Sequence, residues 1–142
     1  MADVSASERG RALIVVVERD PHVRALERYF LERAGFTVEF CDDGLTALHK
    51  VRELVPNIVI SEVLVPRLDG LALCREVKSD PATRHISVLI FSILLSAERA
   101  AEAGADAFMR KPLDDERLID SVERLLRRER ELRDGADHER NP

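Results

Sequence analysis

Cysteine is scarce in this chain of 142 residues, and the two that occur, Cys41 and Cys74, lie far apart. Neither belongs to a CxxC motif or to a Cys/His spacing that suits a structural metal. The four histidines show no ligand spacing either. These features argue against a disulfide framework and a zinc centre, and favour two free thiols in a reducing compartment.

Long apolar runs are also missing, so the sequence offers no segment of the length needed to cross a bilayer. The first residues, Met1 to Arg9, are polar and lack the basic start and apolar stretch of a secretion signal. We therefore expect a cytoplasmic protein without a membrane partner.

Basic residues are outnumbered, with 22 Lys and Arg against 27 Asp and Glu and a formal net charge of −5. Nucleic-acid binding requires a concentrated basic face. A local basic patch is compatible with this charge, but no helix-turn-helix segment is evident. We expect no direct nucleic-acid partner.

The composition itself is typical of one globular domain, with 45% hydrophobic and 35% charged residues in a chain long enough to bury a core. We expect a disordered N-terminal tail over residues 1–10 and a folded domain over residues 11–127. A charged helical extension with a frayed tail is expected over residues 128–142.

Five short apolar runs alternate with five helix-like segments. The runs are Ala12 to Val17, Phe36 to Phe40, Ile58 to Ser61, Val88 to Phe91 and Ala107 to Met109. The first, third and fourth are nearly continuous in Val, Ile and Leu. Strands that are buried on both faces have this composition, which indicates a parallel sheet covered by helices.

The first helix-like segment has clear end signals. Asp20 is placed to cap a helix that begins at Pro21, and Gly35 can adopt the left-handed conformation that ends it. Its apolar face is predicted from Val23, Leu26, Phe30 and Ala34. Further helices are predicted over 44–55, around 71–77, over 97–104 and around 118–126.

This alternation predicts a flavodoxin-like α/β fold, a doubly wound five-stranded parallel sheet with helices on both faces, (βα)5. In such sheets the functional crevice lies at the carboxyl ends of the strands, where strand order reverses. Residues that follow the runs should therefore meet in space. They are Glu18, Arg19, Asp20, Glu62, Ser92, Ile93, Lys111 and Pro112.

The chain from Arg127 onward is dominated by charge. Leu118, Leu125 and Leu132 recur every seven residues, but this repeat is too short to define a coiled coil. We expect a solvated helix that frays by Gly135, with a dimer stalk as the alternative.

Four motifs stand in order at the ends of predicted strands. They are IVVVERDP (14–21), ISEVLVPRLDG (60–70), VLIFS (88–92) and AGADAFMRKP (103–112). In this combination the region from Ala12 to Leu126 resembles the receiver domain of two-component response regulators.

The resemblance implies a phosphorylation site. In that family an Asp at the end of the third strand attacks a phosphoryl donor, carboxylates after the first strand hold Mg²⁺, and a Ser or Thr and a Lys bind the phosphoryl oxygens. The phosphoacceptor position here is Glu62. The acidic-pocket positions are Glu18, Arg19 and Asp20, and the switch and phosphoryl-gripping positions are Ser92, Phe108 and Lys111.

Three positions depart from the family pattern. Glu62 replaces the Asp, and its extra methylene moves the carboxylate by about 1.3–1.5 Å, a misplacement large enough to impair a positioned reaction. Arg19 replaces a carboxylate, and a guanidinium cannot ligate a metal. Ile93 replaces a small residue after the switch hydroxyl.

The formal charges in the pocket balance without a metal, once Asp20 is set aside as a helix cap. We hypothesise that Arg19 pairs with Glu62 or Glu18 while Lys111 binds the other carboxylate. No cofactor and no metal is then expected. In the alternative, Mg²⁺ would be held by Glu18, Glu62 and the Leu64 backbone.

Plainer interpretations exist for each residue. Glu62 and Arg19 could form a surface ion pair of little energetic value. Ser92 could satisfy a strand-end backbone group, and Phe108 could belong to the core. Glu62 also resembles, in the length and charge of its side chain, an Asp that is already phosphorylated.

Two functions follow from the resemblance. The first is a stand-alone, non-enzymatic pseudo-receiver that signals through protein contacts without an aspartyl phosphate. The alternative is a conventional Mg²⁺-dependent phosphoacceptor for a histidine kinase. A flavodoxin-like cofactor domain is disfavoured because no Gly-rich phosphate loop is present.

The expected partners are a histidine kinase, a downstream effector or a second copy of the chain. The resemblance places the contact surface on the fourth helix, the last strand and the fifth helix. Its charged residues here are Arg99, Glu102, Asp106, Arg110 and Arg117. The sequence leaves open whether the chain is part of a longer regulator.

Overall fold

The computed structural model describes residues 4–94 and 96–140, the last five of them as backbone only. Five parallel strands form one sheet in the order β2-β1-β3-β4-β5. They are β1 (Leu13–Val17), β2 (Thr37–Cys41), β3 (Ile58–Ser61), β4 (Ser87–Ser92) and β5 (Ala107–Arg110). The predicted flavodoxin-like (βα)5 fold is confirmed.

Strand order reverses at β1, which pairs with β2 on one side and with β3 on the other. Val17, the last residue of β1, is in register with Ser61, the last residue of β3. The carboxyl ends of the two central strands are therefore level, so the residues that follow them lie side by side at the switch point.

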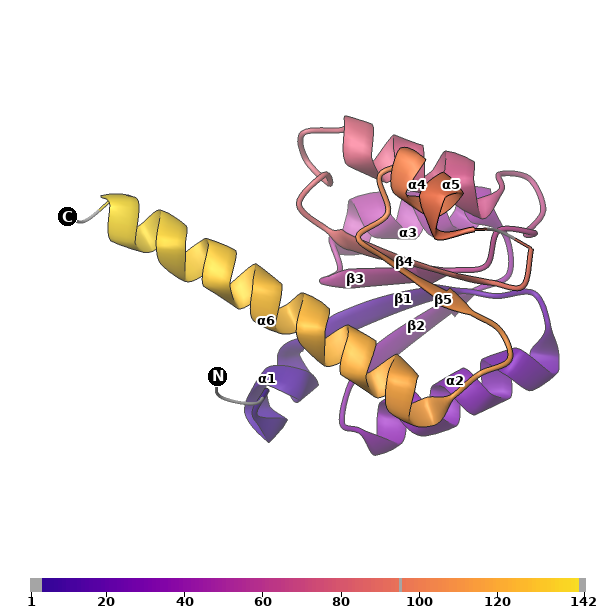
Figure 1. Cartoon of the computed structure of the whole chain (residues 1–142), viewed down its shortest axis with the longest axis horizontal. Coiled ribbons are helices and arrows are strands. Elements are labelled where there is room, and N and C mark those ends of the chain that lie inside the picture. The colour runs from indigo at the N-terminus through magenta and orange to yellow at the C-terminus, as the bar shows by residue number, and fades with distance from the viewer. Residues whose placement is uncertain (1–3, 95, 141–142) are drawn as a thin grey trace.

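Helices cover both faces of the sheet (Figure 1). One face carries α3 (Gly44–Leu54), α4 (Gly70–Ser79) and α5 (Ala97–Glu102), and the other carries α1 (Ala6–Arg11), α2 (Pro21–Arg33) and α6 (Asp115–Arg140). Alternate strand residues point to opposite faces. Val15 therefore belongs to one apolar cluster, while Ile14 and Val16 belong to the other.

Helix α2 begins as predicted, because the Asp20 carboxylate accepts hydrogen bonds from the backbone N–H groups of His22 and Val23. Its apolar face differs from the prediction. Leu26 is 47% exposed, whereas Glu27 and Leu31 are buried. Val23 and Ala34 pack against the apolar cluster as predicted, so the observed face differs from the predicted one at Leu26, Glu27 and Leu31.

The predicted disordered tail over residues 1–10 is wrong for the described part of that segment. Ser5 caps helix α1 in a capping box with Glu8. Val4 is buried in the apolar cluster that contains Ile14 and Val16. Arg9 forms an ion pair with Glu123 of α6 and donates to the Ala34 carbonyl at 3.0 Å. Helix α1 thus packs against the remainder of the domain.

The predicted fraying at Gly135 is also wrong, because α6 continues through this residue to Arg140. Its outer turns run past the edge of the sheet (Figure 1). None of the helices over the described residues has the length and apolar content that crossing a bilayer requires.

Candidate functional site

A cleft of about 610 Å³ lies at the carboxyl ends of the strands. Glu18 follows β1 and Glu62 follows β3, and both carboxylates lie in this cleft. The backbone N–H of Glu62 donates to the Val17 carbonyl at 3.0 Å, which extends the β1–β3 pairing to the predicted phosphoacceptor position. Gly70 is required behind it, because a Cβ there would collide with the Glu62 carbonyl.

Lys111, which follows β5, connects the two carboxylates. Its Nζ lies 2.8 Å from Glu18 Oε1 and 2.7 Å from Glu62 Oε2, and all three side chains are largely buried. Burial opposes the charge on Lys111, but the hydrogen bonds to Glu18 and Glu62 outweigh it and raise the pKa of Lys111. Lys111 is therefore the cation that balances the charges of both carboxylates.

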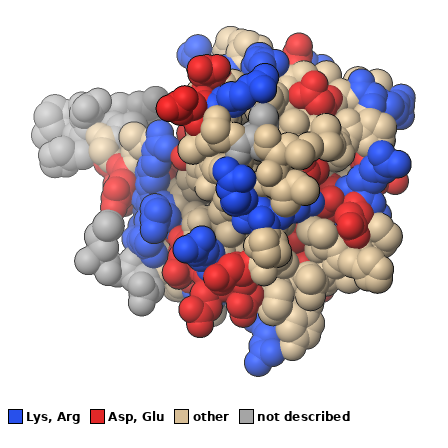
Figure 2. Space-filling view, turned by 45° about the vertical axis from the view of Figure 1, so that its right-hand side comes forward, with Lys and Arg blue, Asp and Glu red and all other residues tan. Residues whose placement is uncertain are grey.

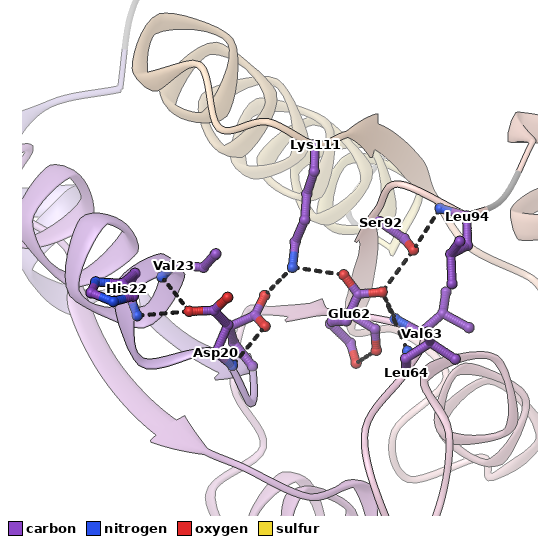
Figure 3. A network of polar contacts seen from close by, with 11 residues as sticks. Asp20, His22, Val23, Glu62, Val63, Leu64, Ser92, Leu94 and Lys111 are labelled. Atoms are coloured by element: carbon purple, nitrogen blue, oxygen red, sulfur yellow. Dashed lines mark hydrogen bonds and ion pairs between the residues drawn. The ribbon is translucent and has the colours of Figure 1, made fainter.

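The Glu62 carboxylate accepts hydrogen bonds from groups on three sides (Figure 3). Oε1 accepts from the Ser92 hydroxyl at 2.7 Å and from the backbone N–H groups of Val63 at 2.9 Å and Leu64 at 3.3 Å. Oε2 faces Lys111. Burial alone would raise the pKa of Glu62, but these donors lower it below its ordinary value.

Ser92 is fully buried at the end of β4. Its hydroxyl donates to Glu62 and accepts from the backbone N–H of Leu94 at 3.2 Å. The same side chain thus contacts the carboxylate and the loop that leads to α5. Phe108, the other predicted switch position, is partly buried and packs against the cluster beneath α3, α4 and α5.

The predicted pairing of Arg19 with Glu62 or Glu18 is wrong. Arg19 lines the cleft but is exposed, and it forms no ion pair with any described residue. The reason is geometric. Arg19 lies between Glu18, whose side chain turns inward, and Asp20, whose side chain caps α2, so its own side chain turns to solvent.

The donor set around the cleft is a poor fit for Mg²⁺. This ion requires nearly octahedral oxygen coordination and usually binds carboxylates directly. The Lys111 ammonium lies between the two buried carboxylates, and the Asp20 carboxylate is engaged as a cap. Within the described ranges, no group of three or more His, Cys, Asp or Glu residues is arranged to hold a metal ion.

Glu27 was not singled out from the sequence, although it lies near the cleft charges. Its side chain is 1% exposed, and Oε1 has no hydrogen-bond partner among the described residues. Burial, together with the negative charge of Glu18, raises the pKa of Glu27 to about 8. The spacing of Val23, Glu27 and Leu31 at i, i+4 and i+8 is the signal that could have revealed its buried position.

Aliphatic side chains surround the mouth of the cleft. Leu64, Ile93 and Leu94 come from two different loops and are each more than half exposed. Ile93 therefore lies at the entrance, where the family resemblance led us to expect a small residue. Leu64, Ile93 and Leu94 thus form an apolar entrance to the part of the cleft that contains Glu18, Glu62 and Lys111.

The charged residues predicted for the interaction face lie in two places. Arg99, Glu102, Arg110 and Arg117 are exposed. Asp106 precedes β5 at the opposite edge of the sheet from the cleft, and its carboxylate is bonded within the fold. Asp106 is therefore separated from the other four.

Comparison with known proteins agrees with this geometry. The family described as "Response regulator receiver domain" matches residues 14–123. The chain therefore belongs to the response regulator receiver domain family.

The chain is similar to the response regulator MprA of Mycobacterium ulcerans, with 39% identity over 81% of this chain and 50% of the relative. Among solved structures, it is similar to the signal receiver domain of a histidine kinase from Syntrophus aciditrophicus, with 38% identity, a TM-score of 0.72 and coverage of 81% and 89%. Similarity to NtrX of Brucella abortus has a TM-score of 0.81 and 29% identity, over 90% of this chain and 30% of that one.

The chain spans about half or less of the length of the curated relatives that it matches. The similarity thus concerns the receiver domain that these proteins share.

Proposed function

We propose that this receiver domain signals through protein contacts without forming an aspartyl phosphate, as a pseudo-receiver. The observation that carries the proposal is the full occupation of the Glu62 carboxylate by Ser92, Lys111 and two backbone N–H groups. In the family, a Ser or Thr and a Lys bind the oxygens of the phosphoryl group. Here the carboxylate of Glu62 already engages the corresponding residues.

The length of the Glu62 side chain explains how its carboxylate reaches Ser92 and Lys111. A carboxylate one methylene farther from the backbone than that of Asp lies about 1.3–1.5 Å farther out, toward the region that an attached phosphoryl group would enter. From there it reaches the Ser92 hydroxyl at 2.7 Å and Lys111 at 2.7 Å. We propose that Glu62 holds the domain in the contact pattern that phosphorylation would otherwise produce.

The charge balance supports operation without a divalent ion. A carboxylate nucleophile that approaches a phosphoryl group needs a cation to offset the repulsion between their charges. In this cleft Lys111 is already shared by Glu18 and Glu62, and Arg19 is turned to solvent. We propose that no cofactor is required and that the domain is not an enzyme.

The partners in this proposal are proteins, either a histidine kinase or a downstream effector, or a second copy of the chain. The proposed contact surface consists of α5, β5 and α6, with Arg99, Glu102, Arg110 and Arg117 as its exposed charges. A conventional phosphoacceptor function for Glu62 is the competing outcome of the experiment.

The test is incubation of the protein with a small phosphodonor and Mg²⁺, followed by intact mass spectrometry. We expect no phosphoryl adduct on the unmodified chain. A double variant, Glu62→Asp with Arg19→Asp, restores the carboxylates of the family pattern and is expected to gain an adduct. This variant shows whether the remaining residues of the site can support the reaction.

An adduct on the unmodified chain that disappears in the Glu62→Gln variant would overturn the proposal. An adduct that persists in this variant would lie elsewhere, and tryptic mapping would locate it. In that case the proposal would stand, because Glu62 would not be the acceptor.

A further inference from the structure

A basic hollow lies at the amino-terminal edge of the sheet, between α6 and the turn that leads into β4. Its volume is about 480 Å³. Its charged lining consists of four cations and two carboxylates, which leaves two positive charges in a chain whose net charge is −5. These residues are Lys78, Arg84, Arg128, Arg133, Asp106 and Glu129. We call this hollow the amino-edge groove.

The two carboxylates of the amino-edge groove are engaged within the protein. Asp106 forms an ion pair with Lys78 at 2.7 Å and accepts from the backbone N–H of Val88 at 2.8 Å. Glu129 accepts from the side-chain amide of Asn57 at 3.1 and 3.3 Å. Asp106 also pairs with Arg128 at 3.4 Å, whereas Glu129 forms no ion pair with an arginine among the described residues. Arg84 and Arg133 are therefore not neutralised by the carboxylates of the groove.

The arginines are more accessible than the carboxylates. Arg84 and Arg133 are exposed and form no ion pair with any described residue. The Arg128 side chain is 58% exposed, although one of its nitrogens lies 3.4 Å from Asp106. Each guanidinium group presents its N–H donors in a planar fork that suits a carboxylate.

An apolar side chain lies beside these cations. Leu132 lines the groove and is 66% exposed, which makes it the most exposed large hydrophobic residue in the described part of the chain. Arg128, Leu132 and Arg133 all follow residue 123, where the family match ends. On the face of the molecule drawn in Figure 2, Lys and Arg side chains lie in several groups among Asp and Glu side chains.

We propose that the amino-edge groove is a docking surface for an acidic amphipathic segment of a partner protein. Apolar side chains of that segment cover Leu132, while its carboxylates bind Arg84, Arg128 and Arg133. Charge complementarity selects an acidic occupant, and the exposed leucine selects one that also has an apolar face. Nucleic acid suits the surface less well, because two carboxylates line it and the net charge of the chain is negative.

This proposal concerns the edge of the sheet opposite to the cleft, so it does not depend on the state of Glu62. It adds a second contact surface to the one formed by α5, β5 and α6.

The test measures fluorescence anisotropy with a labelled synthetic peptide that has leucines along one helical face and glutamates along the other. We expect saturable binding that weakens as salt is raised. The double variant Arg84→Glu with Arg133→Glu is expected to weaken binding at least about tenfold, because attraction becomes repulsion. Leu132→Ser is expected to weaken it by about tenfold through loss of apolar burial.

The matched control is Arg75→Glu with Arg33→Glu, which makes the same change in net charge at exposed positions of α4 and α2. It is expected to change the affinity by less than about twofold. An equal loss in the control would overturn the proposal, because the peptide would then sense only net charge.

Three other outcomes would also overturn the proposal. They are equal binding of a peptide with lysines in place of the glutamates, tighter binding of a DNA oligonucleotide, and self-association that the groove variant abolishes. In the last case the occupant would be a second copy of the chain, and sedimentation velocity would detect it.

Discussion

Lys111 and Glu62 form an ion pair of 2.7 Å that joins the end of β5 to the end of β3. The side chains are only 14% and 8% exposed, so solvent screens the pair weakly. Glu18 shares the same ammonium group at 2.8 Å. One lysine therefore balances carboxylates that follow two different strands, and its removal leaves two buried negative charges together.

Replacement of Lys111 should destabilise the domain strongly. For Lys111→Met we expect a loss of about 3 kcal/mol in the free energy of unfolding, because both buried carboxylates lose their cation. Urea denaturation monitored by circular dichroism measures it. The control is Lys50→Met, which removes the half-exposed pair with Glu39 at 3.4 Å and should cost about 1 kcal/mol or less. Equal losses in the two variants would show that the buried ion pairs stabilise the fold no more than the half-exposed pair does.

Ser92→Ala should weaken the site without abolishing the fold. The variant removes the donor to Glu62 at 2.7 Å and the acceptor for Leu94 at 3.2 Å, at an expected cost of about 1–2 kcal/mol in the free energy of unfolding. Because a donor to the carboxylate is lost, the pKa of Glu62 should rise, which ¹³C NMR of the carboxyl carbon can follow. The control Ser79→Ala removes an exposed hydroxyl contact and should change stability by less than about 0.5 kcal/mol.

Glu27 should make stability fall as the pH rises from acid to alkaline. Its pKa is raised to about 8 in the folded protein, from an ordinary value of 4.5. The folded state therefore binds this proton more tightly than the unfolded state does. Between these two pKa values stability should decrease by about 1.4 kcal/mol for each pH unit, and above the folded pKa the contribution should level off.

Urea denaturation at several pH values between 5 and 9 tests this prediction. In Glu27→Gln the decrease over that window should be absent, because the amide does not ionise. Glu27→Leu should in addition be more stable than the unmodified chain at neutral pH, since no polar group remains buried without a partner. A Glu27→Gln variant that keeps the slope would assign the pH dependence to another group. Glu53→Gln, at an exposed position, is the control and should keep the slope.

Magnesium chloride should leave the cleft unchanged. Because the Lys111 ammonium lies between Glu18 and Glu62, we expect no saturable shift of the backbone amides of Val63 and Leu64 in ¹H–¹⁵N NMR spectra. The double variant Glu62→Asp with Arg19→Asp should show such shifts, since it adds a carboxylate. Saturable, site-localised shifts in the unmodified chain would contradict a metal-independent cleft.

Much of the fold could be predicted from local signals in the sequence. The runs around Val15, Val59 and Leu89 are apolar on both faces, which parallel strands covered by helices require. Asp20 and Pro21 mark the start of α2. These signals are local, because they depend on the conformational preferences and burial of a few consecutive residues.

The membership of the cleft followed from the same reasoning. Parallel strands end at one edge, so Glu18, Glu62, Ser92 and Lys111 had to meet there once the alternation was recognised. Which side chains bond to one another could not be predicted in this way. From formal charges alone, Arg19 and Lys111 were equally good candidates to pair with Glu18 and Glu62.

The sequence by itself determined the order of the elements and the strand ends at which polar side chains gather, because hydrophobic periodicity and caps act over short distances. Only the tertiary structure decided that Lys111 binds both carboxylates, that Arg19 faces solvent and that Glu27 is buried. These outcomes depend on the rotation of each helix and the direction of each side chain. Contacts between residues remote in the chain set both, and no single segment encodes them.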